Sequence, residues 1–126
     1  MNSGLEWLAA HQNKDGSWSL QLHEGSSTSD TAATGFALLP FLAAGHTPKD
    51  GKYQPVVAKA VAWLIATQKS NGDLLAPKDT AQHQMYAHGV AAIALCEAFG
   101  MSQLPELRGP AQKSLDFIAA AQHSPT

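Results

Sequence analysis

Hydrophobic residues along the chain follow two alternating patterns. Within residues 54–69 and 108–122, apolar residues recur every three or four positions, as on one face of an amphipathic helix. Each of these segments is preceded by one that is apolar nearly all round, at residues 32–44 and 87–99. A helix of this second kind must be buried on most sides. The pattern therefore predicts outer amphipathic helices that alternate with inner apolar helices.

The turn and cap residues divide this pattern into five helices and no strand, which makes the expected fold class all-α. The expected helices cover residues 3–13, 30–44, 54–69, 82–99 and 108–122. Ser29 or Asp30 is a suitable N-cap for the second helix. Gly45 and Gly100 are expected to end the two inner helices. Four prolines are expected to lie in loops or first turns: Pro48, Pro55, Pro105 and Pro110. Pro40 lies inside an apolar helical pattern, where it is expected to kink the helix or end it early.

The chain repeats itself with a period of about 55 residues. Residues 5–18 resemble residues 61–74, and the matching pairs are Trp7 and Trp63, Gln12 and Gln68, Gly16 and Gly72, and Trp18 and Leu74. A third copy begins at Leu115 and reaches Gln122. The inner segments also repeat in sequence, since residues 31–47 match residues 86–102. We therefore expect one domain over residues 1–126, made of about two and a half helical-hairpin repeats.

The odd number of helices leaves the last outer helix without an inner partner. Helical repeats bury their apolar faces against their neighbours, so an open array exposes an apolar edge. Two partners for this edge are expected as alternatives: the remaining repeats of a longer chain, or other copies of the same chain.

The spacing Leu8-x3-Gln12-x3-Gly16-x-Trp18 resembles the QW motif of terpene cyclases. The chain thus resembles the prenyltransferase and squalene-oxidase repeat family, which includes squalene–hopene cyclases and many bacterial proteins. This resemblance implies a partial α/α toroid whose inner helices line an apolar cavity. The motif positions would be structural, the glutamine bonding a tight turn and the glycine supplying its conformation. These positions are Gln12, Gly16, Trp18, Gln68, Gly72 and Gln122.

Asp30 is the first weak catalytic candidate. Squalene–hopene-type cyclases protonate an alkene with the central aspartic acid of a D-x-D-D-T-A motif, and here the corresponding stretch reads Ser-Thr-Ser-Asp-Thr-Ala. Ser29 stands where the proton donor would be, and a hydroxyl lacks the acidity for that step. The alternative interpretation of Asp30 is a carboxylate that caps the positive end of a helix dipole.

A second group of candidates lies in the second inner helix. His83, Tyr86 and His88 are expected near the rim of the cavity, and His88 is either a further weak catalytic candidate or a hydrogen-bonded core histidine. Cys96, the only cysteine, lies two helical turns from His88, about 12 Å at 1.5 Å per residue, which is too far for a shared metal ion. Cys96 is therefore interpreted as a small buried hydrophobe. No metal and no cofactor is expected.

Composition and charge narrow the partners. Hydrophobic residues make up 44% and charged residues 14% of the 126 residues, which is a core-forming composition. A net charge of −2 without a basic patch argues against nucleic acid and against an anionic membrane surface. No transmembrane segment and no signal peptide is recognised, so a cytoplasmic location is favoured.

Two function classes remain. The first is a toroid repeat module without catalysis on its own, acting as a scaffold or binding an apolar, isoprenoid-like ligand or a partner. The second is a fragment of an isoprenoid-metabolising enzyme, a cyclase or prenyltransferase, whose catalytic residues lie elsewhere. Function depends on sites and not on folds, and here the structural motif is more complete than the catalytic one.

Overall fold

The computed structural model describes residues 3–19, 29–76 and 84–122, and the description below is confined to them. These residues form five helices and no strand, as the sequence predicts. The helices are α1 (Ser3–Ala10), α2 (Asp30–Ala43), α3 (Gln54–Thr67), α4 (Gln84–Ser102) and α5 (Pro105–Gln122). His83 lies outside the described residues, as does the side chain of Gln122.

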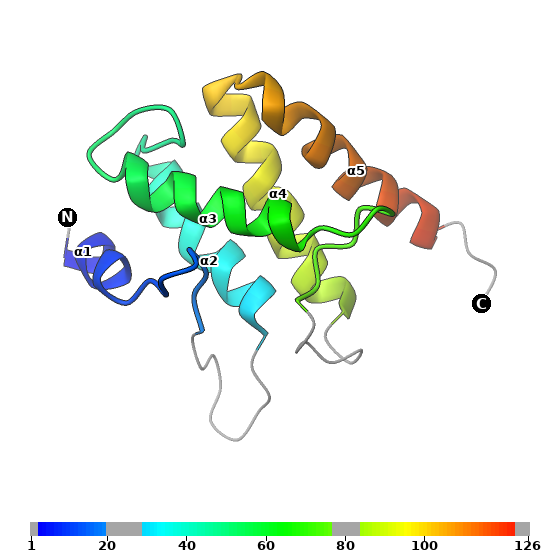
Figure 1. Cartoon of the computed structure of the whole chain (residues 1–126), viewed down its shortest axis with the longest axis horizontal. Coiled ribbons are helices and arrows are strands. Elements are labelled where there is room, and N and C mark those ends of the chain that lie inside the picture. Colours follow the sequence, from blue (N-terminus) through cyan, green and yellow to red (C-terminus); the bar gives the residue numbers. More distant parts are fainter. Residues whose placement is uncertain (1–2, 20–28, 77–83, 123–126) are drawn as a thin grey trace.

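The helices form two layers. The inner helices α2 and α4 pack on each other more extensively than any other pair, and α5 packs along α4. Helix α3 crosses over both α2 and α4, while α1 lies at the far end against α2 (Figure 1). The core between the layers consists largely of alanine and leucine, with Trp18 and Phe41 as its largest fully buried side chains. Small residues on the inner helices allow their close approach.

Helix α2 shows why its ends lie where they do. The Ser29 hydroxyl accepts a hydrogen bond from the Ala32 N–H at 3.1 Å, which makes Ser29 the N-cap and Asp30 the first helical residue. At the other end, Gly45 adopts φ 92°, as expected of a glycine that ends a helix. The His46 N–H then donates to the Phe41 carbonyl at 3.0 Å.

Of the two effects expected of Pro40, a kink or an early end of the helix, the early end is wrong. Helix α2 continues through Pro40 to Ala43. The surrounding residues Leu38, Phe41 and Leu42 are buried in the core, so tertiary packing holds the last turn although proline supplies no N–H.

Other expected boundaries are also wrong, and α1 ends at Ala10, three residues earlier than expected. Gly100 does not end α4, which runs on to Ser102. The helix stops instead at Gln103, whose φ is 57° and whose N–H donates to the Phe99 carbonyl at 2.7 Å. Helix α5 begins three residues earlier than expected, at Pro105, so Pro110 lies inside this helix and not in its first turn. None of the described helices is long and apolar enough to cross a membrane.

Candidate functional site

The turn after α1 is closed by its own backbone and by one carboxylate. The Asn13 N–H donates to the Ser17 carbonyl at 2.8 Å, and the Gly16 N–H donates to the Asn13 carbonyl at 3.0 Å. Asp15 accepts both the N–H of Ser17 at 3.0 Å and its hydroxyl at 2.7 Å. These donors stabilise the ionised carboxyl and lower the pKa of Asp15, the Ser17 hydroxyl contributing most.

The Gln12 side chain joins this turn to the next outer helix. Its Nε2 donates to the Gly16 carbonyl at 2.9 Å and to the Val56 carbonyl, in the first turn of α3, at 3.0 Å. Gly16 adopts φ 101°, and a Cβ at this position would collide with the Lys59 carbonyl. Only glycine allows the turn to approach α3 this closely.

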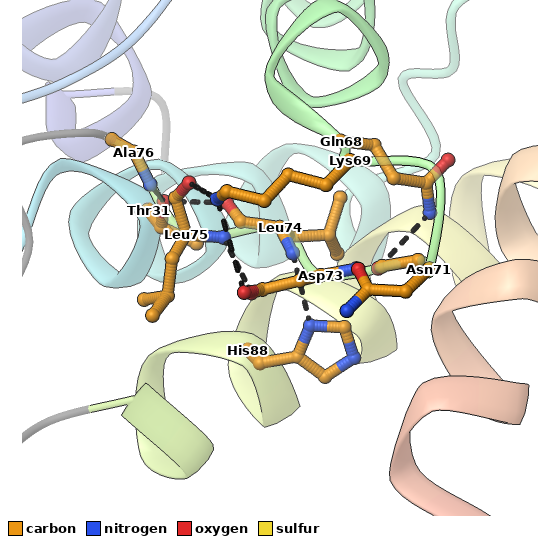
Figure 2. Close-up of polar contacts among 10 residues, drawn as sticks. Thr31, Gln68, Lys69, Asn71, Asp73, Leu74, Leu75, Ala76 and His88 are labelled. Carbon is orange, nitrogen blue, oxygen red and sulfur yellow. Dashed lines mark hydrogen bonds and ion pairs between the residues drawn. The ribbon is translucent and has the colours of Figure 1, made fainter. Parts of the chain in front are cut away.

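The turn after α3 repeats the backbone bonds and the glutamine bonds of the first turn. Gln68 Nε2 donates to the Gly72 carbonyl at 3.3 Å and to the Pro110 carbonyl, in α5, at 2.9 Å. Asn71 takes the place of Asp15 by accepting the Asp73 N–H at 3.0 Å (Figure 2). Gly72 adopts φ 97°, and a Cβ there would collide with the Lys113 carbonyl.

Each turn also bonds to an inner helix, and this contact fixes the register of the repeat. The Trp18 N–H donates to the Thr34 hydroxyl at 3.0 Å, and the Leu74 N–H donates to His88 Nδ1 at 3.2 Å. Thr34 and Gly35 therefore correspond to His88 and Gly89. The pairing of residues 31–47 with residues 86–102 is wrong by one position, because the turns and the helices do not share a single spacing.

The sequence left two interpretations of His88 open, and the structure places it in the core. The ring is 0% exposed. Because Nδ1 accepts from Leu74, the ring proton is on Nε2, which donates to the Ser114 carbonyl of α5 at 2.9 Å. The Phe117 ring packs on it with 4.7 Å between centroids. His88 thus connects the second turn, α4 and α5.

Trp18 is the buried anchor of the first turn. It is fully buried, its Nε1 donates to the Leu8 carbonyl at 2.8 Å, and its ring lies 6.1 Å from that of Phe41. Leu74, at the matching position of the second turn, is also fully buried. Each turn therefore buries one apolar side chain in the core.

Asp30 is half-buried at the start of α2 and accepts a hydrogen bond from the Ser19 hydroxyl at 3.0 Å. Of the two expected N-cap candidates, Ser29 makes the capping hydrogen bond and Asp30 is the first residue of the helix. The neighbouring Thr31, which sequence reasoning passed over, is buried and bridges the second turn. Its hydroxyl donates to the Leu74 carbonyl at 2.8 Å and accepts from the Ala76 N–H at 3.0 Å (Figure 2). The stretch that resembles an acid motif therefore supplies a cap and an inter-repeat bridge.

Cys96 is half-buried on α4, and its thiol donates weakly to the Ala111 carbonyl at 3.9 Å. Burial raises the pKa of this thiol. In the ranges that the structure describes, no three His, Cys, Asp or Glu side chains gather in a way that fits a metal ion.

The two inner helices present apolar side chains to the exterior. Phe36 of α2 and Tyr86 of α4 pack with 5.9 Å between ring centroids, and Tyr86 is 57% exposed. Ile93 and Met101 of α4 are also exposed. We name this surface the inner face and define it by Phe36, Tyr86, Ile93 and Met101. Tyr86 was an expected rim residue, and the structure places it here beside Phe36 and away from the buried His88.

Comparison with known proteins adds two partial matches. Over 80 residues, the chain is 40% identical to the squalene–hopene cyclase of Bradyrhizobium diazoefficiens. Over 111 residues, it is 28% identical to the lanosterol synthase of Mus musculus. Part of the chain is thus similar in sequence to terpene cyclases.

The matches cover more than half of this chain but only a small part of each relative. They cover 57% and 87% of this chain but 11% and 14% of the two cyclases. No protein-family model and no solved structure matches the chain. The chain therefore spans only a small part of the length of either cyclase.

Proposed function

We propose that the chain is a repeat module of a terpene-cyclase-like α/α toroid that binds an apolar, isoprenoid-like ligand on its inner face and does not catalyse a reaction on its own. The observation that carries this proposal is the exposed ring pair of Phe36 and Tyr86 on two adjacent inner helices. Exposed aromatic and aliphatic side chains that gather on one surface are typical of interaction sites. The partial similarity to two triterpene cyclases favours an isoprenoid over other apolar ligands.

In this proposal the QW-like positions act as a scaffold. Gln12 and Gln68 each satisfy a carbonyl of their own turn and a carbonyl of the next outer helix. They therefore fix the distance between successive outer helices without contacting the inner face. Gln122 would do the same for a following outer helix.

Asp30 and its neighbours do not supply the acid that a squalene–hopene-type cyclase uses. The carboxylate of Asp30 lies at the start of α2 and accepts a hydrogen bond from the Ser19 hydroxyl at 3.0 Å. Protonation of an alkene needs a positioned general acid. Ser29, at the position of the proton donor, is occupied as the helix cap.

The binding part of the proposal is tested by displacement of a dansylated isoprenoid with farnesol. We expect saturable binding that Phe36→Ser and Tyr86→Ser each weaken by about tenfold, since each removes an apolar contact worth about 1–2 kcal/mol. Leu115→Ser is the matched control, because Leu115 is 48% exposed but lies on the outer helix α5. Equal weakening by Leu115→Ser, or no saturable binding at all, would show that the inner face is not a ligand site.

The partial similarity also favours a second candidate, a fragment of an isoprenoid-metabolising enzyme whose catalytic residues lie in other repeats. The two candidates differ in the sequence that flanks this chain in its gene. Further repeats with a D-x-D-D motif favour the enzyme, whereas repeats without an acid motif favour the module. The cytoplasmic location stays a prediction under both candidates.

A further inference from the structure

The inner helices α2 and α4 carry equivalent residues in unequal surroundings. The turn contacts of Thr34 and His88 pair each residue of α2 with a residue 54 positions later in α4, so that Gly35 corresponds to Gly89. The same register pairs Thr31 with Met85 and Leu42 with Cys96. The environment of each pair can therefore be compared directly.

Gly35 is the point of closest approach between α2 and α4. A Cβ on Gly35 would lie 2.8 Å from Val90 Cγ1 and 3.0 Å from the Ala91 nitrogen. At the equivalent Gly89, a Cβ would meet nothing within 4 Å. The second repeat thus presents the same glycine, but no helix lies on it among the described residues.

The residues around Gly89 are uncovered in the same way. Thr31 is 0% exposed and its counterpart Met85 is 45% exposed. Leu42 is 3% exposed, whereas Cys96 is half-buried. Leu39 is half-buried, and its counterpart Ile93 is 58% exposed. In the first repeat, by contrast, Val90 and Ala91 of α4 lie against Gly35, and Ala32 packs with Leu75 and Ala87.

We propose that the free edge of α4, formed by Met85, Gly89 and Cys96, is the docking surface for one further apolar helix of the same repeat. This helix packs on Gly89 as α4 packs on Gly35. The inference rests on the proposed function in that it assumes a toroid module, but it concerns the edge between inner helices and not the ligand on the inner face.

A second copy of the chain fits this edge less well than a further repeat unit. A copy whose α2 lay on Gly89 in the same register would bring its own α1 into the outer layer beside that helix. An inner helix of a further repeat would follow α5 in the chain, just as α4 follows α3. Helix α5 already occupies that position by packing along α4. The edge therefore fits an inner helix that follows α5 in the repeat. A second copy would bring its own α1 to the place that α5 already occupies.

The test uses the full chain and an extended chain. The extended chain joins residues 1–122 to a second copy of residues 69–122, so that Gln122 is followed by the turn that follows Gln68, and the cysteine of the appended copy is replaced by alanine. We expect a higher unfolding midpoint for the extended chain. We also expect the reaction of Cys96 with a thiol reagent to slow by at least about tenfold, because labelling then requires local opening.

A glycine substitution makes this test specific to the proposed edge. Gly89→Leu should leave the melting temperature of the original chain unchanged or raise it slightly, because the added side chain meets open space and glycine is a poor helix former. In the extended chain, Gly89→Leu should abolish both the gain in stability and the protection of Cys96. Gly35→Leu should destabilise both chains.

Gly109→Leu is the matched control. Gly109 is also a helical glycine with nothing within 4 Å of its Cβ position. Its counterpart in α3 is Pro55, which stays exposed although a following repeat is already in place. Gly109→Leu should therefore leave the protection of Cys96 in the extended chain intact.

Several outcomes would overturn the proposal. Equal effects of Gly89→Leu in both chains, or unprotected Cys96 in a folded extended chain, would show that no helix docks on Gly89. If the extended chain does not fold, a peptide of the α4 sequence with cysteine replaced by alanine is added to the original chain. Protection of Cys96 by this peptide, lost in Gly89→Leu, supports the proposal, and an unchanged labelling rate contradicts it.

Self-association has its own signature. If Cys96 of the original chain becomes protected as the protein concentration is raised, a second copy is the occupant and the proposal is wrong. Loss of farnesol binding would refute the proposed ligand function but would leave these labelling results unaffected, so the two failures can be told apart.

Discussion

Thr34 and His88 accept the same hydrogen bond in the two repeats of this chain. Thr34 receives the Trp18 N–H and His88 receives the Leu74 N–H. Threonine reaches the turn with a hydroxyl, whereas histidine reaches it with a ring nitrogen and still has Nε2 to bond the Ser114 carbonyl. A residue that resembled a catalytic candidate in the sequence therefore performs a structural task that a threonine performs elsewhere.

We predict that both acceptors contribute to stability by satisfying a buried N–H. Thr34→Val should lower the free energy of unfolding by about 1–3 kcal/mol, because it leaves the Trp18 N–H without its partner. His88→Leu should cost more than His88→Thr, which retains an acceptor for Leu74 but cannot reach Ser114. Urea denaturation checks these values, with Thr67→Val, at the half-buried end of α3, as control. Equal costs for the two His88 variants would contradict the shared role.

The turn between α1 and α2 should be equally sensitive to its side chains. We expect Gln12→Ala to cost about 1–3 kcal/mol, since two carbonyl groups lose their donor. Trp18→Ala should cost about 3–5 kcal/mol because it leaves a large cavity in the core. Gln112→Ala is the control, as this exposed glutamine donates only along its own helix to Asp116. If Gln12→Ala matches the control, the link from the turn to α3 carries no stability.

The start of α2 distinguishes a cap from a candidate acid. We predict that Ser29→Ala lowers the free energy of unfolding by about 1 kcal/mol, the usual cost of removing an N-cap. Asp30→Asn should cost about 1 kcal/mol or less, since it removes only a charge near the helix N-terminus. Thermal unfolding of the two variants checks this order. A turnover of any isoprenoid that Asp30→Asn abolishes without unfolding the chain would contradict the structural role of Asp30.

Asp15 makes the first turn sensitive to acid. Hydrogen bonds from Ser17 place the pKa of Asp15 in the folded chain below its value in the unfolded chain. Its stabilising effect is therefore present above the unfolded value and is lost as the pH falls through the folded value. We expect the urea midpoint of the original chain to exceed that of Asp15→Asn from pH 7 to about 5 and the difference to shrink as the pH falls below about 4. A difference that does not change with pH would contradict this account.

The sequence predicts most of the architecture, because hydrophobic periodicity and turn glycines are local signals. The five helices, the turns at Gly16 and Gly72 and the cap at Ser29 all follow from such signals. The end of α4 does not, since Gln103 and not Gly100 adopts the left-handed conformation. Likewise, the continuation of α2 past Pro40 depends on packing with residues distant in the sequence.

The site is less predictable than the fold. The repeat pattern identifies Gln12 and Gln68, but their partners Val56 and Pro110 are more than 40 residues away. The role of Thr34 does have a signal in the sequence. Thr34-Gly35 aligns with His88-Gly89 when the two inner helices are offset by 54 residues, whereas an offset of 55 hides the match. The exposure of Phe36 and Tyr86 is a tertiary property with no local signature.

The central claim, an apolar ligand on the inner face, is tested most directly by mapping farnesol binding onto backbone amide chemical shifts. The account predicts shifts that saturate and that concentrate at Phe36, Tyr86 and Ile93. Trp7 and Leu115, which are comparably exposed on the outer helices α1 and α5, should change little. Shifts spread evenly over exposed apolar residues of both layers, or centred on Leu115, would contradict it.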